Sequence, residues 1–181
     1  MPDSYKLIID TLRLILFLEC NLKCTYCCNR QEQFNSLFRE KKISEINFNF
    51  YKNICITGGE PFLYKNIFYK ILNLLPEDKD IYIYTNGLLI NNCDLLLLAS
   101  HTNIKCINIG LHTRHQLLAI NKNLDKHLPV RFMVEQQYYN ELLQLYPDRL
   151  NTKNLKAWEM DNCIMHNEDW VLLKQEANNE L

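Results

Sequence analysis

Four cysteines lie close together near the start of the chain and carry its clearest chemistry. Cys20, Cys24 and Cys27 form a Cys-x3-Cys-x2-Cys pattern, and Cys28 follows directly. Three thiolates this close in sequence are able to hold three irons of a four-iron cubane, whereas the usual four would saturate it. Three ligands therefore leave one iron open to bind another molecule.

Zinc is the main alternative for this cysteine group. A structural zinc site takes four ligands, usually with a second Cys or His pair later in the chain. No such pair follows, although one of the isolated histidines is able to supply a single ligand; these are His101, His112, His115, His127 and His166. Ordinary buried thiols, and Cys28 as an alternative ligand, also stay open. The separate Cys55, Cys93 and Cys106 are expected in the core, where Cys packs as a small hydrophobe.

A second group of residues suited to ligand binding follows the run Ile54-Cys55-Ile56-Thr57. The chain has only 4 glycines, each at the end of a strand-like run, and two of them open the sequence Gly58-Gly59-Glu60-Pro61. Glycines let the backbone approach a ligand closely, and the Glu60 carboxylate is able to accept a hydrogen bond from a cationic amine. Pro61 suits the first turn of a following helix.

Strand-like runs alternate with helix-like stretches, in which apolar residues recur at spacings of three and four. The strand candidates are Leu12–Leu18, Ile54–Thr57, Ile81–Tyr84, Ile104–Ile109, Pro129–Val134 and Leu155–Met160. The helix candidates are Leu63–Leu75, Asn91–Ser100, His115–His127 and Tyr138–Tyr146, and the polar stretch Arg30–Tyr51 reads as a helix plus loop. This alternation predicts an α/β fold with a parallel sheet, whose ligands bind at the carboxyl ends of the strands.

Composition and charge exclude several classes of protein. The chain has 181 residues, and 20 Lys and Arg against 21 Asp and Glu leave a net charge of −1. A dedicated nucleic-acid binder would carry an excess of basic residues. The longest apolar stretches are shorter than the roughly 20 residues of a membrane span. The N-terminus shows no signal-peptide pattern, so no membrane contact and a cytoplasmic location are expected.

The two motifs together resemble those of the radical S-adenosylmethionine (SAM) enzymes. Tyr26 is the aromatic residue before the third cysteine, and Gly58-Gly59-Glu60-Pro61 stands where that family carries its Gly-Gly-Glu-Pro motif. The resemblance implies a partial (β/α)6 parallel barrel as a single domain over residues 1–166, followed by a polar C-terminal tail or last helix over 167–181. It also implies a [4Fe–4S] cluster on Cys20, Cys24 and Cys27 that binds SAM.

The resemblance further assigns residues to cofactor and substrate. It implies that Tyr26, Gly58, Gly59, Glu60 and Pro61 form part of the SAM site, with Glu60 holding the SAM amine. Thr85 and Asn86 match a Thr-Asn-Gly sequence that lies beside SAM or substrate in many members. His112 is the candidate contact to the SAM ribose or substrate, Arg131 the candidate for the SAM carboxylate or a substrate anion, and Cys163 a candidate hydrogen donor.

The implied activity is reductive cleavage of SAM to a 5'-deoxyadenosyl radical that abstracts hydrogen from a small molecule or peptide. An electron donor such as flavodoxin or ferredoxin is the expected partner. No auxiliary cluster is expected, because only Cys163 lies beyond residue 106. The alternatives are an activating enzyme for a glycyl-radical protein, an iron–sulfur carrier that binds no SAM, and a zinc-stabilised binding module.

Overall fold

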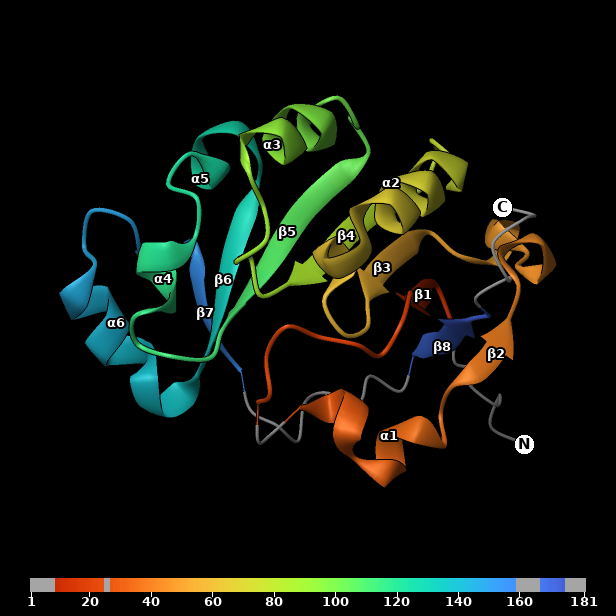
Figure 1. The fold of residues 1–181 in the computed structure, drawn as a ribbon, viewed down its shortest axis with the longest axis horizontal. Helices are drawn as coiled ribbons and strands as arrows, with labels where there is room; N and C mark the ends of the chain where they lie inside the picture. The colour runs from red at the N-terminus through yellow and green to blue at the C-terminus, as the bar shows by residue number, and fades with distance from the viewer. Residues whose placement is uncertain (1–8, 25–26, 159–166, 175–181) are drawn as a thin grey trace, which may run out of the picture.

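The computed structural model describes residues 9–24, 27–158 and 167–174, which build one parallel sheet (Figure 1). Its strand order is β2-β8-β1-β3-β4-β5-β6-β7, and every paired strand runs parallel to its neighbour. The strands are β1 (Thr11–Ile15), β2 (Arg39–Lys41), β3 (Asn53–Thr57), β4 (Asp80–Thr85), β5 (Ile104–Leu111), β6 (Val130–Glu135), β7 (Leu155–Trp158) and β8 (Glu168–Leu173).

Helices lie in most of the described connections between the strands. They are α1 (Glu32–Asn35), α2 (Lys65–Leu74), α3 (Asn92–Ala99), α4 (Gln116–Ala119), α5 (Leu124–His127) and α6 (Tyr139–Leu145). Short 3-10 turns lie at Cys28–Arg30, Ile43–Glu45, Phe48–Phe50, Pro61–Tyr64 and Gln136–Tyr138. None of the helices in the described part of the chain is long and apolar enough to cross a membrane.

The six predicted strands are all present, and they lie side by side in chain order as β1, β3, β4, β5, β6 and β7. A crossover through one or more helices separates each of these strands from the next. This arrangement follows from the right-handed connection that parallel neighbours require. The predicted α/β fold with a partial (β/α) barrel is therefore confirmed, with two strands added beside β1.

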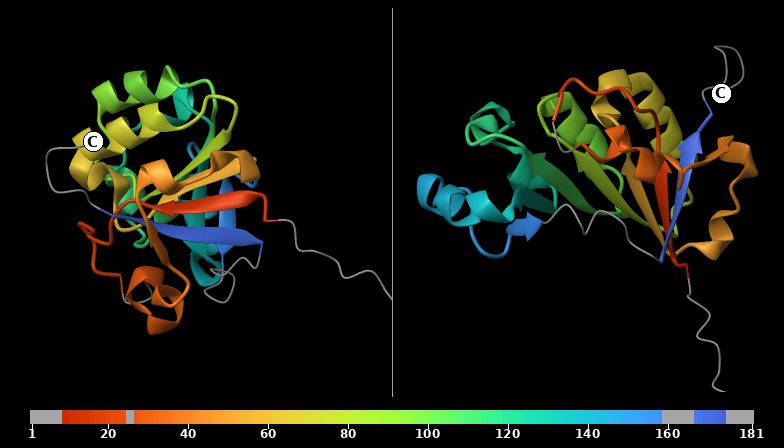
Figure 2. Two further views of the ribbon diagram at one scale, coloured as in Figure 1. Left: turned by 90° about the vertical axis from the view of Figure 1, so that its right-hand side faces the viewer. Right: turned by 90° about the horizontal axis from the view of Figure 1, so that it is seen from below.

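One of the added strands corrects the prediction of a polar tail or last helix over residues 167–181. Residues Glu168–Leu173 form β8, which pairs with all five residues of β1; Figure 2 shows the two strands side by side. Two acidic residues open this strand and make it look polar, but Glu168 pairs with Arg13 and Asp169 with Arg39. Trp170, which follows them, is only 8% exposed.

Two helical predictions also differ from the structure in detail. The stretch expected as one helix from His115 to His127 splits into α4 and α5, and the guanidinium of Arg149 donates to the carbonyls of Leu117, Ile120 and Asn121. Those bonds satisfy carbonyls at the break that a continuous helix would have used internally. The polar stretch Arg30–Tyr51 holds α1 as expected, together with the short strand β2.

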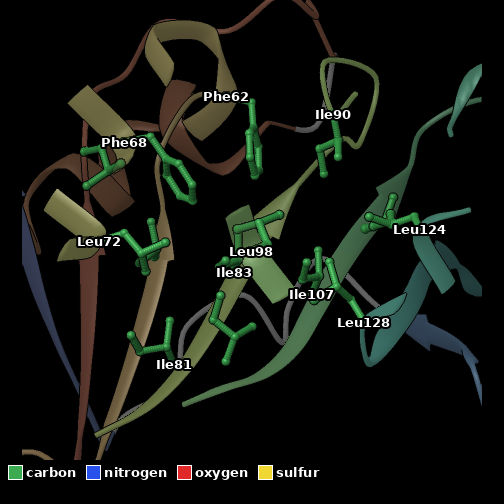
Figure 3. Packing of buried hydrophobic residues seen from close by; sticks show 14 of the residues in the cluster. Phe62, Phe68, Leu72, Ile81, Ile83, Ile90, Leu98, Ile107, Leu124 and Leu128 are labelled. Atoms are coloured by element: carbon green, nitrogen blue, oxygen red, sulfur yellow. The ribbon is translucent and has the colours of Figure 1, made fainter. Parts of the chain in front are cut away.

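The main hydrophobic core lies between the sheet and the helices α2 and α3 (Figure 3). Phe68 and Leu72 of α2 and Leu98 of α3 are at most 2% exposed and pack with Ile83 and Ile107 of the sheet. Burying one such side chain contributes about 1.5–3 kcal/mol. Side chains alternate along a strand, so the residues next to these isoleucines, such as Tyr84 and Asn108, point to the other face of the sheet. We call this the inner face.

Candidate functional site

The chain after β1 runs along the carboxyl ends of the strands towards the cysteines. The Leu16 N–H donates to the Thr57 carbonyl at 3.1 Å, which continues the β1–β3 pairing by one residue. The buried Phe17 ring then packs edge-on against Tyr64, with ring centroids 4.9 Å apart. These contacts hold the start of the cysteine loop on the sheet.

Gly58 and Gly59 bring their backbone against this loop. The Gly59 N–H donates to the Phe17 carbonyl at 2.7 Å, and the Glu60 N–H donates to the Glu19 carbonyl at 2.8 Å. A Cβ on Gly59 would lie 1.7 Å from the Glu19 carbonyl oxygen, and Gly58 has φ +127°, which favours glycine. The close approach predicted for the two glycines therefore exists, but it is made to the residues just before Cys20.

Glu60 is fully buried, and its carboxylate bonds within the chain. It accepts hydrogen bonds from the Phe62 N–H at 3.1 Å, the Thr85 hydroxyl at 2.7 Å and the Asn86 N–H at 2.8 Å. Burial raises the pKa of Glu60, and these three bonds partly oppose that rise. The carboxylate therefore ties the end of β3 to the end of β4, and its role of holding the SAM amine stays a prediction.

Pro61 is buried and opens the 3-10 turn that leads into α2, which confirms the predicted helix start. The Glu60 side chain caps this turn through the Phe62 N–H. Proline suits this position because it has no backbone N–H, and an N–H in a first turn would have no partner within the helix. Pro61 thus fixes the direction in which the chain leaves the site.

Thr85 and Asn86 end β4 and are also buried. The Thr85 hydroxyl accepts from the Gly87 N–H at 2.9 Å while it donates to Glu60. The Asn86 Nδ2 donates to Asn21 Oδ1 at 2.7 Å and to Cys20 Sγ at 3.9 Å. The structure therefore brings the two predicted motifs and the cysteine loop together at one edge of the sheet.

The three cysteines predicted as ligands lie in this loop, and each is half-buried. The pKa of Cys24 is raised by burial and then by the negative charges of Cys27 and Cys20, and the pKa of Cys20 is raised by burial. The thiols are thus close enough to repel one another as thiolates. Tyr26 lies outside the described residues.

These three thiols form a donor set suited to iron. Among the described residues, no three His, Cys, Asp or Glu side chains converge around a point that one metal ion would occupy. Thiolates are the usual ligands of iron–sulfur clusters, and each thiolate binds a different iron. Three thiols in one loop therefore fit three irons of a [4Fe–4S] cluster, whose positive irons would relieve the repulsion between the thiolates.

The remaining cysteines divide between core and surface. Cys28 packs against the cluster of Ile15, Phe34 and Trp170, on the side of the sheet away from α2 and α3. Cys55 and Cys106 are buried as predicted, and burial raises the pKa of both, whereas Cys93 is exposed because it lies on the outer side of α3. Cys163, the candidate hydrogen donor, lies outside the described residues.

His112 follows β5 at the same edge of the sheet. Its ring lies over Gly110, where a Cβ would come within 2.9 Å of the His112 Nε2. Burial lowers the pKa of His112, and the nearby Glu135 opposes this. The imidazole is therefore held largely neutral, the form that both donates and accepts hydrogen bonds.

Gln116 is a site residue that the sequence reasoning missed. Its Nε2 donates to the carbonyls of Asn86 at 2.8 Å and Gly110 at 2.7 Å, and its Oε1 accepts from the His112 N–H at 2.7 Å. It thereby joins the ends of β4 and β5 and orients His112. No spacing pattern signals this role, because glutamine is a common residue on exposed helix surfaces and only its burial sets this one apart.

The inner face of the sheet carries polar groups below this edge. Arg13 pairs with Glu168 through two hydrogen bonds, 2.5 and 2.9 Å long, and its guanidinium lies 4.9 Å from the ring centroids of both Tyr84 and Trp170. Arg131, the predicted anion contact, is exposed and pairs in register with Asn108 of β5. Among the described residues, the buried Asn108 Nδ2 has no hydrogen-bond partner.

Comparison with known proteins identifies the family. Residues 14–133 match the model of the radical SAM superfamily. A GTP 3',8-cyclase of Clostridium perfringens (strain 13 / Type A) is 31% identical over 125 residues, which cover 62% of this chain and 38% of that protein. Probable GTP 3',8-cyclases of Archaeoglobus fulgidus and Methanococcus vannielii are 36% identical over 95 residues and 37% over 101, covering 50% and 51% of this chain.

The chain spans only 32–38% of the length of these three relatives. The family model nevertheless covers more than half of the chain and includes both motifs in one continuous match. The chain therefore belongs to the radical SAM superfamily, whose members use a [4Fe–4S] cluster and S-adenosylmethionine.

Proposed function

We propose that this chain is the core of an enzyme that holds a [4Fe–4S] cluster on Cys20, Cys24 and Cys27 and cleaves SAM reductively. One observation carries the proposal: the cysteine loop is fastened to the ends of β3 and β4 by the backbone of Gly59 and by Asn86. That arrangement holds three thiols at the ligand-binding edge of a parallel sheet.

When bound, the cluster supplies one electron and SAM supplies the 5'-deoxyadenosyl radical that abstracts hydrogen from the substrate. The protein provides the positions of these groups. Gly58 and Gly59 fix the path of the chain into Cys20, and Glu60 acts as a positioning residue that holds Thr85 and Asn86. We assign His112 to a contact with the SAM ribose or with the substrate, because its neutral imidazole faces the same edge.

We further propose that the substrate lies against the inner face and carries an anionic group. Arg131 and Asn108 are register partners on neighbouring strands, so their side chains lie on the same face of the sheet. Arg131 is exposed and offers a positive charge, and Asn108 Nδ2, which has no hydrogen-bond partner among the described residues, offers a donor. GTP is the first substrate to test, because the relatives are named GTP 3',8-cyclases and its phosphates have this chemistry. A small peptide with a carboxylate is the second.

The electron reaches the cluster from a separate carrier in this proposal, such as flavodoxin or ferredoxin. The described residues offer no second cysteine group to act as an internal relay. None of the described cysteines forms a disulfide, as is usual in reducing compartments. We therefore place the protein in the cytoplasm.

The test begins with anaerobic reconstitution of the full chain with iron and sulfide. After reduction with dithionite, chromatography measures the 5'-deoxyadenosine formed from SAM, with and without GTP. Cys24→Ala should abolish this product and reduce the bound iron. Cys28→Ala is the matched control, and it should retain both because Cys28 packs in a hydrophobic cluster.

The possible results separate the alternatives. Product in the wild type and in Cys28→Ala, but not in Cys24→Ala, supports the proposed ligands. Tight zinc binding without iron uptake would replace the proposal with a binding module. A loaded cluster without product in either condition, and without any change in its EPR spectrum on addition of SAM, would point to an electron carrier.

A further inference from the structure

Asn86 lies where three segments of the site meet, and all of its polar atoms are engaged. Its backbone N–H donates to Glu60, and its backbone carbonyl accepts from Gln116. Its side-chain Oδ1 accepts from the Leu88 N–H at 3.0 Å. The side chain is therefore held in one orientation from three directions.

That orientation is set by hydrogen bonding. Because Oδ1 faces the Leu88 N–H, the amide nitrogen must face the opposite way, towards the cysteine loop. An amide nitrogen carries two hydrogens. Asn21 Oδ1 accepts at 2.7 Å, and Cys20 Sγ lies 3.9 Å away within hydrogen-bond reach. A flipped amide would set N–H against N–H at Leu88.

The Cys20 sulfur receives a second donor as well. The Leu22 N–H donates to it at 3.3 Å. This bond comes from the backbone of a residue two positions from the cysteine in the same loop, so a change of side chain does not remove it. The bond from Asn86 comes from a side chain 66 positions away, on a residue that is only 5% exposed, so a substitution removes it. The fold thus delivers a buried N–H donor to one particular ligand sulfur.

We propose that Asn86 raises the reduction potential of the cluster through an N–H···S hydrogen bond to the Cys20 thiolate. This inference rests on the proposed function, because it requires a cluster on Cys20. Reduction places additional negative charge on the cluster and its thiolates, and a hydrogen-bond donor stabilises that charge more strongly than the oxidised form. Asn86 is thus a positioning residue that acts through Cys20 and makes the cluster easier to reduce.

Two variants remove the donor in different ways. Asn86→Asp keeps the oxygen that Leu88 requires but replaces the N–H donor with a carboxylate, and Asn86→Ser removes the donor without adding charge. Asn21→Ser is the matched control, because it removes the other acceptor of the Asn86 amide and leaves that amide in place. The readout is the midpoint potential of the reconstituted full-length protein, titrated without SAM and followed by EPR, after its iron content has been measured.

We expect Asn86→Ser to lower the equilibrium constant for reduction at least threefold. The midpoint potential would then fall by about 28 mV, because a tenfold change in this constant equals about 59 mV for one electron. Asn86→Asp should lower it further, and Asn21→Ser should stay within threefold of the wild type. Unchanged potentials in both Asn86 variants, or an equal shift in Asn21→Ser, would overturn the inference while leaving the proposed function intact. A wild-type protein that takes up no iron would overturn the proposed function and the inference with it.

Discussion

A substitution at Gly59 tests whether the two motifs are held together by backbone contact. In Gly59→Ala the new Cβ would lie 1.7 Å from the Glu19 oxygen, 2.3 Å from the Glu19 carbonyl carbon and 2.8 Å from the Leu18 carbonyl carbon. All three are main-chain atoms, so the two loops must separate. Separation breaks the hydrogen bonds from Gly59 to Phe17 and from Glu60 to Glu19.

The size of the effect follows from these losses. Overpacking costs about 1–3 kcal/mol, and each lost hydrogen bond costs about 0.5–1.5 kcal/mol. Because two hydrogen bonds are lost, we expect Gly59→Ala to lower the free energy of unfolding by about 2–6 kcal/mol. Because Glu19 directly precedes Cys20, the iron bound after reconstitution should fall as well.

Gly110→Ala is the matched control for this change. Gly110 lies near the end of β5 and, like Gly59, has no positive φ, but its Cβ would meet the far end of the His112 side chain, at 2.9 Å from Nε2. A side chain is able to move where a main chain is not, so the free energy of unfolding should stay within about 1 kcal/mol of the wild type.

The assay is urea unfolding of the reduced apoprotein, followed by far-ultraviolet circular dichroism, with the free energy extrapolated to water. The same preparations are then reconstituted and their iron content is measured. Equal stabilities for Gly59→Ala and Gly110→Ala would refute the reasoning, because the two variants differ in what the new Cβ meets.

Three further predictions concern stability. Glu168→Gln leaves the guanidinium of Arg13, whose side chain is only 11% exposed, without its carboxylate and should cost about 3–5 kcal/mol in urea unfolding. Arg13→Met combined with Glu168→Leu should recover most of that loss. An additive loss in the double variant would contradict this. Thr85→Val removes a donor to the buried Glu60 carboxylate and should lower the free energy of unfolding by about 1–3 kcal/mol. Its control is Thr57→Val, at a hydroxyl without a hydrogen-bond partner among the described residues, which should change that free energy by less than about 0.5 kcal/mol. Burial lowers the pKa of His112 in the folded state, so the unfolded chain binds a proton at this residue more readily than the folded chain does. The contribution of His112 to stability is therefore complete above the unfolded pKa of about 6.5 and is lost as the pH falls through the folded pKa. The wild type should therefore lose more stability between about pH 7.5 and about pH 5.5 than His112→Asn does, and equal losses would show that His112 does not titrate in this range.

The amino-acid sequence determined the parts of this protein that depend on neighbours along the chain. Short strand-like apolar runs between helix-like stretches located the six central strands. The carboxyl ends of parallel strands meet at one edge, so motifs that follow β1, β3, β4 and β5 had to lie together. The spacing of Cys20, Cys24 and Cys27 indicated the family only together with Gly58-Gly59-Glu60-Pro61, and both are local patterns of sequence.

The tertiary structure alone decided what the site residues contact. Glu60 turned out to bind the end of β4, since its hydrogen-bond donors Thr85 and Asn86 are brought to it by sheet pairing. Strand β8 was hidden by Glu168 and Asp169, whose charges look exposed until Arg13 and Arg39 neutralise them across 155 and 130 positions of sequence. Burial and pairing between residues so far apart depend on the packed fold, which a local pattern of residue types does not contain.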